Sequence, residues 1–126
     1  EVVCMDISDI ALAKAKTLAK ENNVDITLLY ADLDNSPLPE NEYDLVICFN
    51  FLERKLFPEI KKTLNHNGIL VYETFTVDYL KYSNFKRQWV LEQNELLKAF
   101  EGFRILQYRE VDKDPKGFAS LIAQKF

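Results

Sequence analysis

The chain has 126 residues, of which 48% are hydrophobic and 13% aromatic, so its length and composition suit one globular domain with an ordinary core. Its 16 basic and 20 acidic residues give a formal net charge of −4, and no basic cluster of the kind that binds nucleic acid is present. No apolar run reaches membrane-spanning length, and the N-terminus lacks a signal-peptide pattern. We therefore predict no nucleic-acid or membrane partner.

The first third of the chain alternates between predicted strand and helix. Ser8 is a good N-cap, and Asp9 favours a helix start electrostatically. The predicted elements are a strand at Val2–Met5 that ends in Asp6, a helix from Ser8 to Asn22-Asn23, a strand at Ile26–Tyr30, and a two-proline loop at residues 35–41.

The stretch Tyr43–Asn50 is the strongest single signal. Leu45 to Phe49 are apolar without alternation, which predicts a strand covered on both faces, as in the centre of a parallel sheet. Ligands of open α/β sheets lie at the carboxyl ends of such strands. Asn50 and the residues after it are therefore the first place to look for a site.

The rest of the chain continues the alternation and then changes. The residues at 76–93 lack a clean period but are rich in aromatic and basic side chains. The predicted elements are a helix containing Phe57, Pro58, Ile60 and Leu64 and stopped by Asn67-Gly68, a strand at Ile69–Phe75, a short helix capped by Asn94 and closed by Gly102, and two strands, Phe103–Val111 and Phe118–Phe126, joined as a hairpin by residues 112–117.

This order predicts an α/β fold: a parallel sheet with helices on both faces, to which the closing hairpin adds an antiparallel strand. Cys4 and Cys48 both lie in apolar runs, which favours buried free thiols over a disulfide and predicts a cytoplasmic location. The three glycines, Gly68, Gly102 and Gly117, are too far apart to form a glycine-rich phosphate loop.

Several segments together resemble class I S-adenosylmethionine-dependent methyltransferases. A parallel sheet that ends in an antiparallel hairpin is typical of that family. The segments that carry the resemblance are Val3–Ser8 (its second strand), Tyr30–Leu33 (after its third), Pro37–Pro39 and Glu42–Cys48 (approach to its fourth and that strand), Leu64–Leu70 (the turn into its fifth), and Tyr72–Thr76 with Asn94–Leu97, which are similar to the small tellurite-resistance-type branch.

The resemblance implies a Rossmann-like methyltransferase sheet over a single domain, residues 1–126, in which the family's first strand, glycine-rich loop and following helix have no counterpart. That first strand lies between the family's second and fourth strands, so its absence exposes two apolar edges. We expect strands 2–6 and 43–50 to close on each other, another chain to fill the gap as a homo-oligomer, or the sequence to be a fragment of a longer protein.

The resemblance also implies S-adenosylmethionine as cofactor and a set of residues that bind it. Most of them also have a simpler interpretation: Asp6 as an acid at a helix start, Ile7 and Phe51 as core residues, and Asp32 as a loop acid. The implied set is Asp6 for the ribose hydroxyls, Ile7 for the adenine edge, Asp32 for the adenine amino group with Leu33 donating its N–H, and Asn50 with Phe51 for the methionine part and the acceptor.

No catalytic residue is assigned. The only histidine, His66, is predicted in an exposed turn at the end of a helix, and no metal-binding pattern is present. Glu73 could orient an acceptor, or it could form an ion pair with a nearby lysine or arginine. Residues 76–90 suit a substrate lid, and their aromatics could equally seal the core.

Two functions therefore compete. The first is methyl transfer to a small molecule, with the missing glycine-rich loop expected to impair it. The second is a non-catalytic methyltransferase-like interaction or assembly module, which that missing loop favours. A nicotinamide dehydrogenase fits less well, because the closing hairpin and the Tyr72–Phe75 strand are not typical of that class of enzyme.

Overall fold

Two compact units make up the chain, and the computed structural model describes all of residues 1–126. The first unit is Glu1–Pro37 and the second is Leu38–Phe126. The expectation of a single domain over residues 1–126 stays a prediction.

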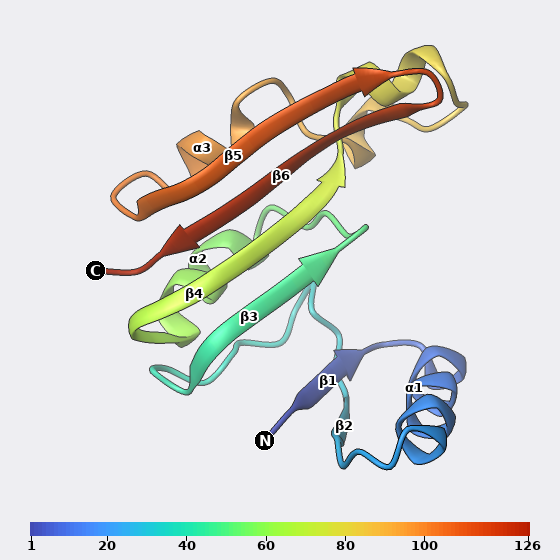
Figure 1. Cartoon of the computed structure of the whole chain (residues 1–126), viewed down its shortest axis with the longest axis vertical. Coiled ribbons are helices and arrows are strands. Elements are labelled where there is room, and N and C mark those ends of the chain that lie inside the picture. Colours follow the sequence, from blue (N-terminus) through green and yellow to red (C-terminus); the bar gives the residue numbers. More distant parts are fainter. The chain divides into compact units, whose positions relative to one another are not determined.

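The first unit is a β-α-β element (Figure 1). Its elements are β1 (Val3–Asp6), α1 (Asp9–Glu21) and β2 (Thr27–Tyr30). Strands β1 and β2 pair in parallel, with Asp6 opposite Tyr30. Helix α1 begins as predicted, because Oγ of Ser8 accepts a hydrogen bond from the Ala11 N–H at 3.1 Å. It ends as predicted at Asn22, whose backbone N–H donates to carbonyls of the last turn.

The second unit is built on a four-stranded sheet in the order β3-β4-β6-β5 (Figure 1). Its strands are β3 (Tyr43–Phe49), β4 (Leu64–Phe75), β5 (Arg104–Lys113) and β6 (Lys116–Gln124). The pair β3–β4 is parallel, whereas β4–β6 and β5–β6 are antiparallel. The α/β fold with a closing antiparallel hairpin is thus confirmed. Strand β4 starts at Leu64, earlier than the predicted Ile69.

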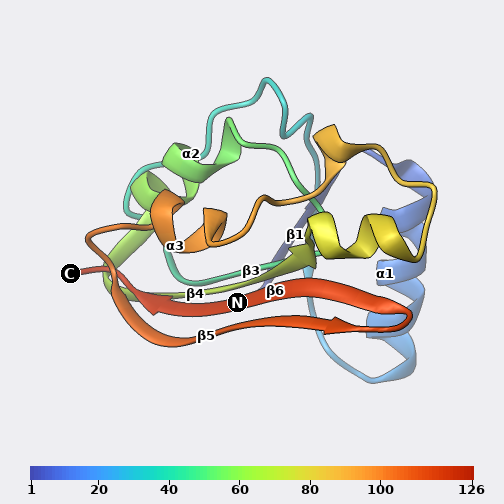
Figure 2. The ribbon, with the colours of Figure 1, turned by 90° about the horizontal axis from the view of Figure 1, so that it is seen from above.

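The helices of the second unit lie on one face of its sheet (Figure 2). They are α2 (Leu56–Thr63), the short 3-10 helices η1 (Val77–Lys81) and η2 (Arg87–Trp89), and α3 (Glu95–Ala99). Tyr72 of β4 is fully buried beneath this layer, with the rings of Phe57 and Phe100 around it. Pro58 lies in the first turn of α2, where its missing N–H costs nothing.

The prediction of helices on both faces is wrong for the second unit. Leu45, Ile47 and Phe49 of β3 are 51%, 56% and 52% exposed, because no helix of residues 38–126 lies on the face that they share. Within residues 38–126, the apolar run is therefore covered on one face only. A continuous apolar run predicts a strand that is covered on both faces, and the helices of this unit cover one of them.

Within its own sheet, strand β3 is an edge strand, as expected from the missing first strand of the family, although its apolar run alone suggested a central one. It pairs only with β4, and β1 belongs to the separate two-stranded sheet β1-β2. Strands 2–6 and 43–50 belong to different units, and their closure on each other stays a prediction. The order within the second unit follows from its own crossovers and hairpin.

Helix α3 starts differently from the prediction. Asn94 stands at its N-cap position, but its side chain makes no capping bond, and its backbone is left-handed with φ of 61°. Its N–H instead donates to Oε2 of Glu110 on β5 at 2.8 Å. Gly102, with φ of +92°, follows the helix as predicted.

Cys4 and Cys48 carry free thiols, as predicted, and both are half-buried. No helix in the chain is both long and apolar enough to cross a membrane. The cytoplasmic location stays a prediction.

Candidate functional site

Two acidic residues follow neighbouring strand ends in the first unit. Asp6 is the last residue of β1, and Asp32 comes two residues after β2. The two strands are parallel, and the Ala31 N–H donates to the Asp6 carbonyl at 3.0 Å, so the pairing continues past the strand ends. The structure thus brings Asp6 with Ile7 and Asp32 with Leu33 to the same edge of one sheet.

The carboxylate of Asp6 is half-buried and partly used by the fold. Its Oδ1 accepts a hydrogen bond from the Ser8 N–H at 2.9 Å, which helps to turn the chain into α1. Its Oδ2 has no partner in the protein. Ile7 is 54% exposed, so it is not a core residue of this unit. A carboxylate with one oxygen anchored and one oxygen open can accept hydrogen bonds from hydroxyl groups.

The carboxylate of Asp32 organises its own loop. Oδ1 accepts from the Asp34 N–H at 3.1 Å, and Oδ2 accepts from the Asn35 side-chain amide at 2.8 Å. The Asp32 carbonyl also accepts from the Ser36 N–H at 2.7 Å. These bonds fit the simpler interpretation of a loop acid, and they also hold the carboxylate at a fixed position beside half-buried Leu33.

In the second unit, Asn50 turns the chain at the carboxyl end of β3. Its backbone is left-handed, with φ of 56°, and its N–H donates to the Glu73 carbonyl of β4 at 2.9 Å. Asparagine adopts this conformation more readily than most residues. The exposed side chain of Asn50 and the 36% exposed ring of Phe51 therefore follow the end of a parallel strand pair.

Tyr72 holds the loop after Asn50 through a hydrogen bond to its backbone. The Tyr72 phenol donates to the Phe51 carbonyl at 2.7 Å, and the Cys48 thiol lies 3.9 Å from the same oxygen. Burial raises the pKa of the Tyr72 phenol well above its usual range and also raises the pKa of the Cys48 thiol. Both groups stay protonated at neutral pH, so Cys48 is a poor nucleophile and Tyr72 a fixed donor.

The sequence reasoning did not identify Arg54, which connects this loop to residues far along the chain. Its Nε and Nη2 donate to the two carboxylate oxygens of Glu95 at 2.6 and 2.9 Å. Its Nη1 and Nη2 also reach the carbonyls of Gln88 and Val90, at 3.2 and 3.0 Å. No local pattern predicts such a pair, because its members are 41 residues apart.

The segment expected to be a lid carries a row of aromatic rings. Tyr79 stacks on Phe75 at 4.3 Å between centroids, Phe85 meets both edge-on, and Trp89 meets Phe85 at 6.3 Å. Phe75 and Tyr79 are half-buried, whereas Phe85 and Trp89 are 40% and 50% exposed. The inner rings thus cover the fold, and the outer rings face solvent.

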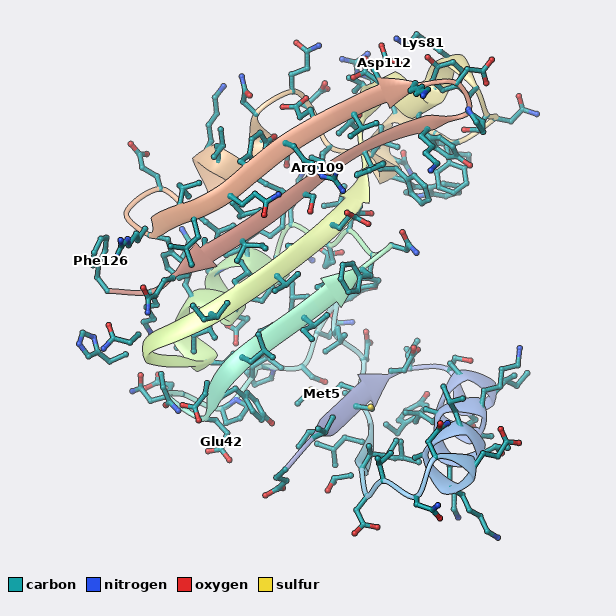
Figure 3. The ribbon with its side chains drawn as sticks, in the orientation of Figure 1. Met5, Glu42, Lys81, Arg109, Asp112 and Phe126 are labelled. Carbon is teal, nitrogen blue, oxygen red and sulfur yellow. The ribbon has the colours of Figure 1, made fainter.

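The β5–β6 hairpin anchors the start of this segment. Lys81 forms an ion pair with Asp112, as Figure 3 shows at the hairpin end. The Tyr82 phenol donates to the other oxygen of Asp112 at 2.6 Å. Lower on the same hairpin, Arg109 stands 5.5 Å over the ring of Phe118 (Figure 3).

Two further residues that the sequence suggested for a site, His66 and Glu73, show no sign of such a role. His66 is exposed near the start of β4, at the end of the strand opposite to Asn50, and it lies in the strand rather than in the predicted helix-end turn. Glu73 is half-buried and forms no ion pair; its backbone carbonyl, not its carboxylate, holds Asn50. No group of three or more histidine, cysteine, aspartate or glutamate side chains could hold a metal ion.

Comparison with known proteins places these features in a family. The family model described as a methyltransferase domain matches residues 1–68, which include both strands of the first unit, β3 and α2. No curated protein sequence matches the chain significantly.

Solved structures share the fold. TehB from Haemophilus influenzae aligns with a TM-score of 0.81 at 18% identity over 100% of this chain and 50% of its own. The [4+2]-cyclase SpnF gives 0.76 at 18% over 99% of this chain and 66% of its own. An S-adenosylmethionine-dependent methyltransferase from Mesorhizobium loti gives 0.77 at 20% over 98% and 80%.

The chain therefore spans half the length of TehB and about two-thirds of SpnF. SpnF is described as a cyclase, so this fold alone does not determine the reaction. The family model, in contrast, covers 68 of the 126 residues. The predicted resemblance is confirmed, and the chain belongs to the methyltransferase domain family.

Proposed function

We propose that this chain takes part in methyl transfer from S-adenosylmethionine to a small-molecule acceptor. The observation that carries the proposal is the position of Asp6 and Asp32, which follow neighbouring parallel strands inside the region that the family model matches. The similar protein from Mesorhizobium loti is described as dependent on S-adenosylmethionine, which supports the same cofactor here.

The first unit would hold the nucleoside end of the cofactor. The open Oδ2 of Asp6 suits the vicinal ribose hydroxyls, since a carboxylate accepts from both. Exposed Ile7 would contact the adenine edge. Asp32 would accept from the adenine amino group, using lone pairs that its loop bonds leave available, and Leu33 would donate its N–H.

The second unit would hold the methionine part and the acceptor through Asn50 and Phe51. The left-handed turn at Asn50 and the Tyr72 bond to Phe51 fix the backbone there before any ligand binds. The three glycines have other places: Gly68 in the turn within β4, Gly102 after α3 and Gly117 beneath η1. Since none supports a glycine-rich loop, the residues of this chain fit the nucleoside better than the methionine carboxylate, and we expect weak binding.

Such a site needs little further chemistry. The cofactor supplies an electrophilic methyl group on a sulfonium, and the displacement is in line. The protein residues align the acceptor and exclude water, so no acid or base is required from the chain. This is consistent with the absence of an assigned catalytic residue.

Calorimetric titration with S-adenosylhomocysteine tests the proposal. Asp6→Asn keeps an oxygen for the Ser8 N–H but removes the charge, so we expect binding about tenfold or more weaker than for the unchanged chain. Asp9→Asn removes an exposed acid of the same unit and should leave the affinity unchanged. Equal affinity of the unchanged chain and Asp6→Asn would remove Asp6 from the site.

The same titration separates the competing functions. Saturable micromolar binding of S-adenosylhomocysteine contradicts the non-catalytic alternative. No heat at millimolar ligand contradicts the proposed function for this chain. A matched titration with a nicotinamide dinucleotide should give no binding, and saturation by it would favour the dehydrogenase instead.

A further inference from the structure

Arg54 joins two parts of the second unit that are far apart in sequence. It lies between β3 and α2, three residues after Phe51, and its guanidinium donates four hydrogen bonds to residues 88–95. Two of them form a fork on Glu95, and two reach backbone carbonyls. Such planar, multiply bonded geometry is specific to arginine, because a lysine ammonium cannot form the fork.

Glu95 is prepared for this bond. Its Oε1 also accepts from the Glu92 N–H at 2.9 Å, and its side chain is 19% exposed, less than the 44% of Arg54. The carboxylate is therefore fixed by its own helix start before Arg54 reaches it. The pair is partly shielded from solvent, where an ion pair is screened less than at the open surface.

The segment that Arg54 binds has a buried part, Val90 and Leu91, and an exposed part, residues 85–89. Val90 and Leu91 are fully buried, and Leu91 exchanges backbone bonds of 2.8 Å with Phe75 and Val77. The preceding turn, residues 85–89, is exposed. It is joined to the rest of the unit by the ring contacts of Phe85, by the bond from Arg54 to the Gln88 carbonyl, and by the fork from Arg87 to Glu92.

The geometry points to Arg54 as a positioning residue that fixes the 86–95 segment, and Trp89 on it, against the loop carrying Asn50 and Phe51. That loop is the acceptor side of the proposed function, so this assignment rests on the proposed function where it speaks of an acceptor. Arg54 would then set the position of an aromatic wall without touching the reacting atoms.

The segment carries its own reporters. Trp89 is the only tryptophan, so its fluorescence and its quenching by acrylamide report this segment alone. Lys86 and Arg87, two potential trypsin sites, precede Trp89 by three and two residues and have exposed side chains. Release of the segment frees their backbone, which η2 holds in a folded turn, so cleavage tracks the fraction of molecules in the open state.

The test compares two identical substitutions. Arg54→Lys keeps the charge but loses the fork and the two carbonyl bonds. Arg87→Lys breaks an equivalent fork, with bonds of 3.0 and 2.9 Å to Glu92, that stays within the segment. Both variants keep the trypsin site. We expect cleavage after residues 86 and 87 to become roughly tenfold faster in Arg54→Lys, with stronger acrylamide quenching, and to change less than twofold in Arg87→Lys.

Glu95→Gln provides a second route if Arg54→Lys does not fold, as checked by far-ultraviolet circular dichroism. It leaves the carbonyl bonds of Arg54 in place, so the same readouts should rise by a smaller factor. Cleavage and quenching at the level of the unchanged chain in each folded variant would overturn the assignment. So would an equal rise in Arg87→Lys, because the effect would then be local to the segment.

The acceptor-side role has a separate readout. Arg54→Lys should bind S-adenosylhomocysteine within about twofold of the unchanged chain, because Asp6 and Asp32 would hold its nucleoside and Arg54 bonds to neither of them. A tenfold loss would place Arg54 in the cofactor site and overturn this part. If the unchanged chain does not bind S-adenosylhomocysteine, the proposed function fails, whereas the quenching and cleavage results still decide whether Arg54 positions the segment.

Discussion

The buried phenol of Tyr72 donates a 2.7 Å hydrogen bond to the backbone carbonyl of Phe51. Tyr72 is fully buried on the helix-covered face of β4, and Phe51 begins the loop after β3. A core side chain thus fixes the backbone of the proposed acceptor loop. The position of that loop depends on the packing of the core.

Tyr72→Phe should destabilise the second unit by about 1–2 kcal/mol, because the Phe51 carbonyl loses its strong donor and keeps only the weak Cys48 thiol. Urea unfolding followed by Trp89 fluorescence measures this. Tyr79→Phe is the matched control: its ring stacks on Phe75, but its phenol has no hydrogen-bond partner. Equal stabilities of the two variants would contradict the role of the Tyr72 bond.

Gly117→Ala should be among the most damaging small changes. A Cβ there would stand 2.2 Å from the Tyr79 backbone N, so η1 would have to move off the hairpin. We expect a loss of about 2–3 kcal/mol in the free energy of unfolding. Gly102→Ala meets no atom within 4 Å and suffers only its φ of +92°, which we expect to cost about 1 kcal/mol. The reverse order would show that η1 is not packed on Gly117.

Lys125, which directly follows β6, caps the end of helix α2. Its Nζ donates to the carbonyls of Lys61 and Leu64 at 2.6 and 2.7 Å. Lys125→Met keeps the apolar stem but leaves both carbonyls without this donor, so we expect about 1–2 kcal/mol of destabilisation. Lys113→Met, at an exposed position without an ion-pair partner, should change the unfolding free energy by less than about 0.5 kcal/mol.

Glu95 should make stability depend on pH in the acid range. Burial disfavours its charged form, but the bonds from Arg54 and from the Glu92 N–H outweigh that and hold the pKa of the carboxyl below its ordinary value. The pKa of this carboxyl is lower in the folded chain than in the unfolded chain, where it is about 4.3. The charged carboxyl therefore stabilises the fold above that pH, and this stabilisation is lost as the pH falls through the folded pKa.

Glu95→Gln should therefore flatten the fall in unfolding free energy between about pH 5 and pH 3, compared with the unchanged chain. Glu92→Gln, which removes an exposed carboxylate of the same segment, serves as the control. Parallel pH curves for the unchanged chain and Glu95→Gln would show that the Arg54 pair does not survive in solution.

Local signals in the sequence predicted most elements correctly. The Ser8 cap, the end of α1 at Asn22 and the hairpin around residues 112–117 all follow from side-chain and turn chemistry within a few residues. The order of strands and helices followed from their alternation. These features need no knowledge of distant contacts.

Features that depend on distant partners were missed or misjudged. The apolar run of β3 predicted cover on both faces, but whether a face is covered depends on which other segments fold against it. Arg54 gave no signal, because its partner Glu95 is 41 residues away. The predicted cofactor residues, from Asp6 to Phe51, stay predictions, since their role requires a ligand.

The most direct test of the proposed cofactor site is a two-dimensional amide NMR titration of this chain with S-adenosylhomocysteine. We predict that the amide signals of Ile7 and Leu33 shift together and saturate with one dissociation constant, because both residues follow neighbouring parallel strands of the first unit. Unchanged signals at both residues, or saturable shifts elsewhere in the chain only, would contradict the proposed site.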